Sequence, residues 1–271
     1  MEVKIILHCH STYSYDAKLT LRELRELFLE EGIQGVCMTE HVDKMTEEDA
    51  SAFVKECEAL SDSNFLFIPG FEVPYRLPRG EHAHVLMVGC KEFHSNYAPH
   101  IAALRPWTKS AAFVVLAHPV RNAFEVDPDL LAELDALEVW NQQYEGKRVP
   151  RVRSLRLLEE LREQRPDLLA VGGVDFHRRE HAGSPAITLD VGELTSLAVL
   201  EKLLAGAFRV HSDYTSFYGT MPNAPELVRK HRFDSFLSVM IISIGKTVNK
   251  LLAACGMSLP KGLKQLVRRR L

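Results

Sequence analysis

Histidines are concentrated directly after short apolar runs of this sequence. Five of the twelve follow runs that we expect to be β-strands. They are His8 and His10 after Val3–Leu7, His41 after Gly35–Thr39, His118 after Phe113–Ala117, and His177 after Leu168–Gly172. Barrel enzymes build their sites from residues at the carboxyl ends of strands, so this placement predicts one shared site.

Two pairs of side chains have the spacing of a chelate. Residues i and i+2 of a strand point to the same side, so His8 and His10 project together, as do Asp175 and His177. Three acids in the same regions add oxygen ligands: Asp16, Glu72 and Asp175. This mixture of imidazole and carboxylate suits Zn²⁺, Mn²⁺ or Fe and excludes a thiolate site.

The elements that must hold these residues alternate between strands and helices. Thr20 with Glu23 forms a capping box and begins a helix that Gly32 ends. Other helices are expected from about Thr46, after Asp127–Pro128, and from Pro150 to about Gln164, with further strands at Phe65–Pro69, His84–Gly89, Leu137–Trp140 and Phe208–Val210. About eight strands separated by helices predict a mostly parallel α/β sheet, closed as a barrel or doubly wound.

Composition places the chain among ordinary globular proteins. Its 271 residues are 46% hydrophobic and 25% charged, which predicts one full-sized domain with a short appendage. The five cysteines have no paired spacing and the chain opens on a strand-like run, so we expect a reducing, cytoplasmic setting. Uncharged stretches are shorter than the roughly 18 residues of a membrane span, and no transmembrane segment is expected.

Positive charge is concentrated at the end of the chain. Residues 225–271 hold ten Lys or Arg against two acids, which leaves −11 for the first 224. We therefore expect a first domain over residues 1–222 and a basic helical extension over 223–271, with an amphipathic helix from Asp234 to Ala253. This extension either docks on the first domain or contacts an anionic membrane surface or a nucleic acid.

Six short motifs occur in the order found in a known family. HCHSTYSYDA, MTEH, GFE, AHVLMVG, AHP and GGVDFH resemble the motifs of the PHP (polymerase and histidinol phosphatase) family of metal-dependent phosphoesterases, over roughly residues 1 to 215. The resemblance implies a distorted (β/α)7 barrel with up to three metal ions in its mouth. One of the eight expected strands is then peripheral.

The resemblance also implies a ligand set. It comprises His8, His10, Asp16, His41, Glu72, His84, His118, Asp175 and His177. His82 competes with His84, because the two share a face of a strand. The sequence departs from the commoner pattern where Glu40 replaces an aspartate and where Tyr15 separates Ser14 from Asp16.

Grouped as the family resemblance suggests, these ligands hold two to three divalent ions of Zn, Mn or Fe. The groups are His8, His10, Glu72 and Asp175, then Asp16, His41 and His177, and finally Glu72, His84 and His118. The implied reaction is hydrolysis of a phosphorylated small molecule or nucleotide by a metal-bridging hydroxide. Arg121 is the expected phosphate clamp, with Arg178 and Arg179 as weaker candidates.

Two other functions compete with this interpretation. An amidohydrolase-type barrel that cleaves C–N bonds also uses a strand-end H-x-H, but it normally bridges its metals with a carbamylated lysine, where this sequence offers Glu72. The second is a non-catalytic metal module whose basic extension does the binding. No candidate ligand is missing, which argues against a lost activity.

Overall fold

The strands of the protein lie in two six-stranded sheets. A computed structural model describes residues 1–95 and 100–221, together with 226–229, 236, 240, 243–245 and 247–248. The first sheet has the order β12 (Ser216–Tyr218), β11 (Phe208–His211), β10 (Ala186–Asp190), β1 (Glu2–Cys9), β2 (Gly35–Met38) and β4 (Leu66–Ile68). The second has the order β3 (Glu40–His41), β5 (Gly70–Arg76), β6 (His82–Val88), β7 (Phe113–Ala117), β8 (Ala136–Asn141) and β9 (Leu169–Gly173).

The chain passes from the first sheet to the second twice, each time at a single residue. Thr39 separates β2 from β3, and Pro69 separates β4 from β5. Beyond β9, Phe176 forms a parallel bridge with Cys9 of β1. Both sheets therefore meet where β1, β3 and the end of β9 come together, and the architecture is a mixed α/β fold. A continuous seven-stranded barrel stays a prediction.

Parallel and antiparallel pairs both occur in each sheet. β1, β2 and β4 are parallel, as are β7, β8 and β9, which matches the expected β-α-β units. The β5–β6–β7 run and the β1–β10–β11–β12 run are antiparallel. Four of the twelve described strands, β3, β5, β10 and β12, were not expected from the sequence.

The helices of the described residues are α1 (Leu21–Glu30), α2 (Glu47–Leu60), α3 (Ile101–Ser110), α4 (Pro128–Glu133), α5 (Gln142–Glu145), α6 (Val152–Arg162) and α7 (Ser196–Leu204), with a 3-10 turn, η1, at Arg179–His181. Side chains cap three of them, α1, α2 and α4, at the places expected from the sequence. Thr20 and Glu23 form the predicted capping box of α1. Asp127 caps α4, and α6 begins two residues after the expected Pro150.

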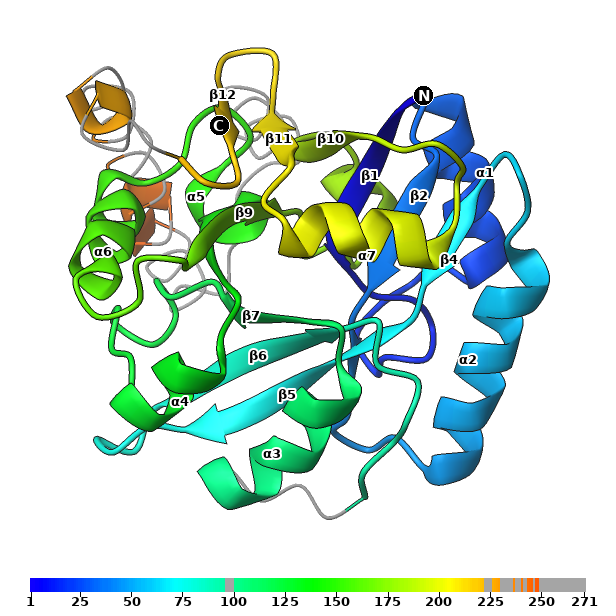
Figure 1. Ribbon diagram of the computed structural model, residues 1–271, viewed down its shortest axis with the longest axis horizontal. Coiled ribbons are helices and arrows are strands. Elements are labelled where there is room, and N and C mark those ends of the chain that lie inside the picture. Colours follow the sequence, from blue (N-terminus) through cyan, green and yellow to red (C-terminus); the bar gives the residue numbers. More distant parts are fainter. Residues whose placement is uncertain are drawn as a thin grey trace.

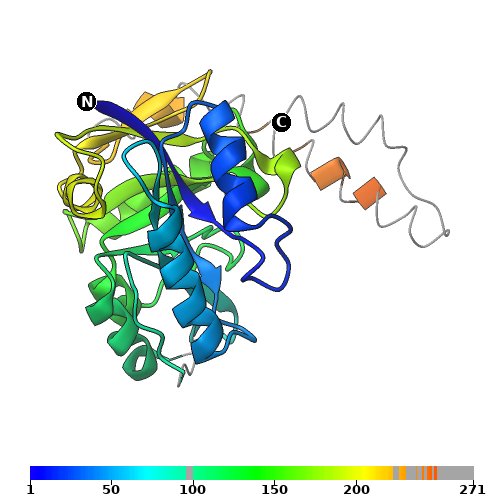
Figure 2. The ribbon, with the colours of Figure 1, turned by 90° about the vertical axis from the view of Figure 1, so that its right-hand side faces the viewer.

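Helices cover the outer faces of the strands. α1 and α2 pack side by side, and α2 lies along β4 (Figures 1 and 2). α3 contacts β5 and β6, α6 contacts β8, and α7 contacts β4, β7 and β10 (Figure 1). The inward faces share a single apolar core, whose largest fully buried side chains include Trp107 and Trp140.

Most of the expected basic extension lies outside the described residues, and so does the expected boundary at 222/223. Within the predicted helix Asp234–Ala253, the described positions 236, 240, 243–245 and 247–248 are helical. Of the residues that the structure describes, none belongs to a helix that is both long and apolar enough to cross a membrane.

Candidate metal centre

A bulge in β1 aims the first candidate ligand. Leu7 pairs with Cys37 and Cys9 pairs with Met38 in neighbouring β2, which leaves His8 as the extra residue. Its φ of 66° lies in the left-handed region. Because a bulge redirects a side chain, His8 reaches the site through a kink and not through the regular alternation expected from the sequence.

Two further candidate ligands have left-handed backbones. The φ angle is 26° at His118, directly after β7, and 54° at Asp175, directly beyond β9. Each such residue costs on the order of 1–3 kcal/mol, and residues of this kind cluster at functional sites. Of the seven non-glycine residues with positive φ among the described residues, these three carry side chains that meet in one cluster.

Glu72 is the centre of that cluster. It follows β4, as expected, but lies within β5, a strand that the sequence did not predict, and is 1% exposed. Five imidazole nitrogens surround its two oxygens: His8 Nε2 at 3.2 Å, His10 Nε2 at 3.2 Å and His41 Nδ1 at 3.4 Å from Oε2, with His118 Nε2 at 3.2 Å and His84 Nδ1 on Oε1. A carboxylate in this position can bridge metal ions.

The two aspartates extend the cluster on either side of His177. Oδ1 of Asp175 lies 3.4 Å from Nε2 of His8, 3.5 Å from Nε2 of His10 and 3.3 Å from Nδ1 of His177. Oδ2 of Asp16 lies 3.4 Å from Nε2 of the same His177. The structure thus brings all nine candidate ligands into one connected group.

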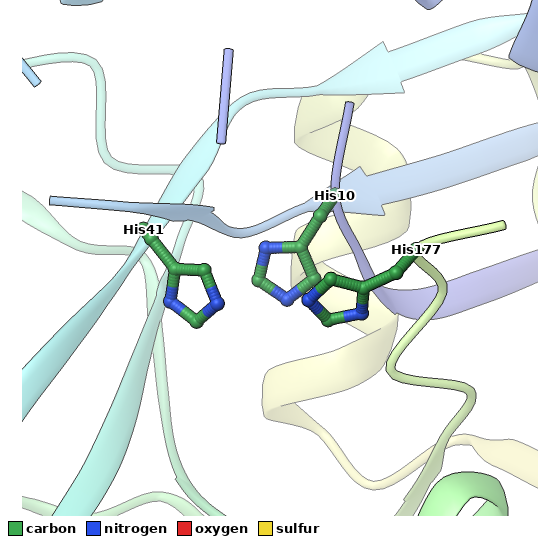
Figure 3. A group of neighbouring side chains, drawn as sticks. All are labelled: His10, His41 and His177. Atoms are coloured by element: carbon green, nitrogen blue, oxygen red, sulfur yellow. The ribbon is translucent and has the colours of Figure 1, made fainter. Parts of the chain in front are cut away.

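Four overlapping sets of three ligand atoms occur here, each with its atoms within 4.8 Å of one another. They are His10, His41 and His177; His8, Glu72 and His118; His8, His10 and Asp175; and His41, Glu72 and His84. Figure 3 shows the first set, in which the His10 ring stacks on His41 at 4.4 Å and on His177 at 4.3 Å between centroids. His10 takes part where the family resemblance implied Asp16.

The donor set fits a cluster of divalent metal ions. Nε2 of His10 lies 3.2 Å from Oε2 of Glu72 but outside hydrogen-bonding geometry, and Oδ1 of Asp16 is buried without a hydrogen-bond partner among the described residues. Nitrogen and carboxylate oxygen are the ligands of Zn²⁺, Mn²⁺ and Fe, as the sequence predicted. Unsatisfied buried acceptors of this kind are expected where an ion completes the bonding.

Burial and charge act against each other on these groups. Burial lowers the pKa of His41 to about 4, so its imidazole is neutral and can donate a lone pair at neutral pH. Burial alone would raise the pKa of Glu72, but His84, His41 and His8 hold it well below its ordinary value. The carboxylate is therefore ionised over the working range of pH.

A polar pocket of about 460 Å³ opens above the cluster. Arg121 and Arg178 contribute positive charge to its wall, while Arg179 lies in η1. Further lining residues are Tyr15, Gln143, Tyr144 and His181. The cationic side chains are positioned to receive an anion next to the candidate ligands.

The two alternatives within the sequence motifs are distinguished by their contacts. His84 reaches Glu72, whereas His82 is exposed near the start of β6.

Glu40 is buried and accepts hydrogen bonds from the backbone N–H of Ser11 and from the hydroxyls of Ser11 and Ser14. Glu40 thus holds the loop that leads to Asp16 through Ser11 and Ser14.

Glu138 is the buried acid that sequence reasoning missed. It lies in β8, is fully buried, and contacts both His8 and His118. The sequence does indicate a buried acid here, because Glu138 is a charged residue inside the otherwise apolar run Leu137–Trp140. A buried carboxylate in such a run needs partners, and here the partners are candidate ligands.

Comparison with known proteins identifies the family. The PHP domain model matches residues 7–160, and the chain belongs to this family. PsfC from Pseudomonas syringae PB-5123 is similar in fold, with a TM-score of 0.51, 13% identity, and coverage of 86% of this chain and 98% of that protein. The lesion-specific endonuclease PfuEndoQ from Pyrococcus furiosus has a TM-score of 0.50 and 14% identity, covering 78% of this chain and 58% of its own. The comparison with curated protein sequences found no match.

Proposed function

We propose that this protein is a metal-dependent hydrolase that cleaves phosphate esters, acting on a phosphomonoester of a small molecule or on a nucleotide. The observation that carries the proposal is Glu72, whose two oxygens face five imidazole nitrogens beneath a pocket that Arg121 lines. Membership of the PHP family supports hydrolysis. The fold likeness to PsfC and PfuEndoQ adds nothing about substrate.

The nine candidate ligands would hold two to three divalent ions of Zn, Mn or Fe. When bound, these ions would supply Lewis acidity and a nucleophilic hydroxide at neutral pH. The ligands are His8, His10, Asp16, His41, Glu72, His84, His118, Asp175 and His177. Because Glu72 contacts histidines of all three implied groups, it would hold the ions close to one another.

The remaining lining residues act on the substrate. The Arg121 guanidinium would bind two phosphate oxygens through its planar fork. Arg178 adds a second positive charge at the wall, and Tyr15 and Tyr144 offer aromatic surface to the group that the phosphate carries. Glu72 occupies the place of the bridging lysine of amidohydrolases, so C–N hydrolysis has less support.

Metal content and turnover test the proposal together. The protein purified with each metal supplement is analysed for bound ions, and is assayed with p-nitrophenyl phosphate and with bis(p-nitrophenyl) phosphate. We expect two to three equivalents of metal, and turnover that a chelator removes and added metal restores. At most one bound ion under every supplement, or fully loaded protein without activity on phosphates and nucleotides, would overturn it.

The proposal for the basic extension is separate. Residues 225–271 would contact an anionic membrane surface or a nucleic acid, or dock on the first domain. Loss of residues 225–271 should leave turnover intact and abolish salt-sensitive vesicle binding if the extension is an anchor. A truncated protein that becomes insoluble supports docking instead.

A further inference from the structure

The carboxylate of Glu138 contacts two candidate ligands, His8 and His118. It lies in β8, where its exposed fraction is 0%. Oε1 lies 3.0 Å from Nδ1 of His8, while Oε2 accepts the backbone N–H of His118 at 2.6 Å and the amide of Asn141 at 3.0 Å. Glu138 is in none of the sets of ligand atoms. Its role therefore concerns how the ligands are held.

The contact with His8 determines which ring nitrogen is free. A carboxylate oxygen only accepts, so the Nδ1 that faces it must carry the proton. Nε2 lies 3.2 Å from Glu72 Oε2 and 3.4 Å from Asp175 Oδ1, and with Nδ1 protonated toward Glu138 it is the nitrogen whose lone pair would be given to a metal ion held by these ligands. Hydrogen bonds of this kind fix the tautomer and the orientation of metal-binding histidines.

Gly173 leaves the space that this contact needs. A Cβ at this position would lie 1.9 Å from Oε1 of Glu138 and 2.9 Å from Cβ of His8. The glycine ends β9, directly beside the bulge in β1. A side chain larger than hydrogen would push the carboxylate away from His8, so the short distance depends on both residues.

The other oxygen of Glu138 holds the backbone at His118. That residue has a φ of 26°, and its amide hydrogen bond to Oε2 ties this strained turn to β8. From there Nε2 of His118 reaches Glu72 Oε1 at 3.2 Å. A single buried carboxylate thus places one imidazole on each side of Glu72.

We propose that Glu138 is a positioning residue that fixes the Nδ1–H tautomer of His8 and the placement of His118, and thereby sets the metal affinity of the centre. The proposal rests on the proposed function, since it assumes that these histidines bind metal. It extends that function by assigning a role to a residue that is not part of the pocket lining.

Glu138→Gln is the decisive substitution because the neighbours determine which way the new amide lies. Two N–H donors, from His118 and Asn141, face the Oε2 position, so the amide oxygen must take that place. Asn141 cannot reverse, because its Oδ1 accepts the backbone N–H of Gln143 and of Tyr144. The new NH₂ group then faces Nδ1 of His8 and forces the proton onto Nε2.

The experiment compares zinc-loaded wild type, Glu138→Gln and Glu145→Gln. Glu145 is a second buried acid near the end of β8, and it bonds Ser154 and the backbone of Arg151, outside the cluster. We expect Kd for zinc to rise by about 10- to 100-fold in Glu138→Gln and to be unchanged in Glu145→Gln. The ¹⁵N spectrum of wild type should show a proton on Nδ1 of His8 that Glu138→Gln loses.

The possible results distinguish a failure of this inference from a failure of the proposed function. Equal zinc affinity of wild type and Glu138→Gln, or a His8 of the wild type that carries its proton on Nε2, overturns the inference. A wild type that binds no metal fails the proposed function instead. If Glu138→Gln does not fold, two measurements still test the inference. They are the zinc affinity of Gly173→Ala and the ¹⁵N spectrum of the zinc-loaded wild type.

Discussion

Arg121 reaches across the mouth of the pocket to His84, with its Nη1 atom 3.5 Å from Nδ1 of the imidazole. The same imidazole nitrogen contacts Oε1 of Glu72, which has the candidate ligands around it. The guanidinium is therefore held directly above the cluster. An anion bound between Arg121 and the cluster would contact the guanidinium on one side and the candidate ligands on the other.

Replacing Arg121 by Lys tests the phosphate clamp. Lysine keeps the positive charge but loses the planar pair of donors, so KM for phosphate substrates should rise by about tenfold while kcat changes less. Arg209→Lys on β11, an exposed arginine outside the pocket, is the matched control. An unchanged KM for every phosphate substrate would place Arg121 outside the site.

Asp175→Asn tests the acid beyond β9. Asparagine tolerates the left-handed backbone seen at this position, so the fold should persist. The variant loses the charge that lies beside His8, His10 and His177, and kcat should fall by about two orders of magnitude or more. Turnover near that of the wild type at equal metal content would remove Asp175 from the ligand set.

The two histidines of β6 form a matched pair for a third test. His84→Ala removes the imidazole on Glu72 and should lower the number of bound ions by about one, with weaker phosphate affinity. His82→Ala removes an exposed ring and should leave metal content and kinetics unchanged. Metal analysis of both variants checks this, and an equal effect of the two substitutions would contradict the assignment.

The candidate ligands were predictable because each follows or lies in a strand of a recognisable motif. Their imidazoles and carboxylates meet because the strands that carry them converge where the two sheets join. The contact between His8 and Glu138 was not predictable in the same way, since it spans 130 positions of the chain. A charged residue inside an apolar strand indicates that a partner exists, but not which residue it is.

Strand β5 illustrates why some strands were not predicted from the sequence. Pro74 lies within it, and a proline normally argues against a central strand because it donates no hydrogen bond. In the structure β3 pairs with β5 only at Phe71 and Glu72, so β3 does not extend alongside Pro74. The proline is therefore tolerated, and Glu72 lies inside a strand that the sequence appeared to interrupt.

Glu145 provides a prediction about stability that is independent of the metal centre. Burial raises its pKa to about 7, against the lowering effects of the hydrogen bonds from Ser154 and the Arg151 backbone. Between the ordinary pKa of 4.5 and the folded value of about 7, the folded protein keeps a proton that the unfolded chain releases. The stabilisation is therefore complete below the lower value and is lost as the pH rises through the higher one.

Glu145→Gln removes this titration and keeps the shape of the side chain. The free energy of unfolding of the variant, relative to wild type, should increase by up to about 3 kcal/mol between about pH 5 and pH 8. Urea unfolding at several pH values measures the difference, and metal-free protein in each sample keeps ligand binding out of the comparison. A difference that stays constant across this range would show that Glu145 is ionised in the folded protein throughout.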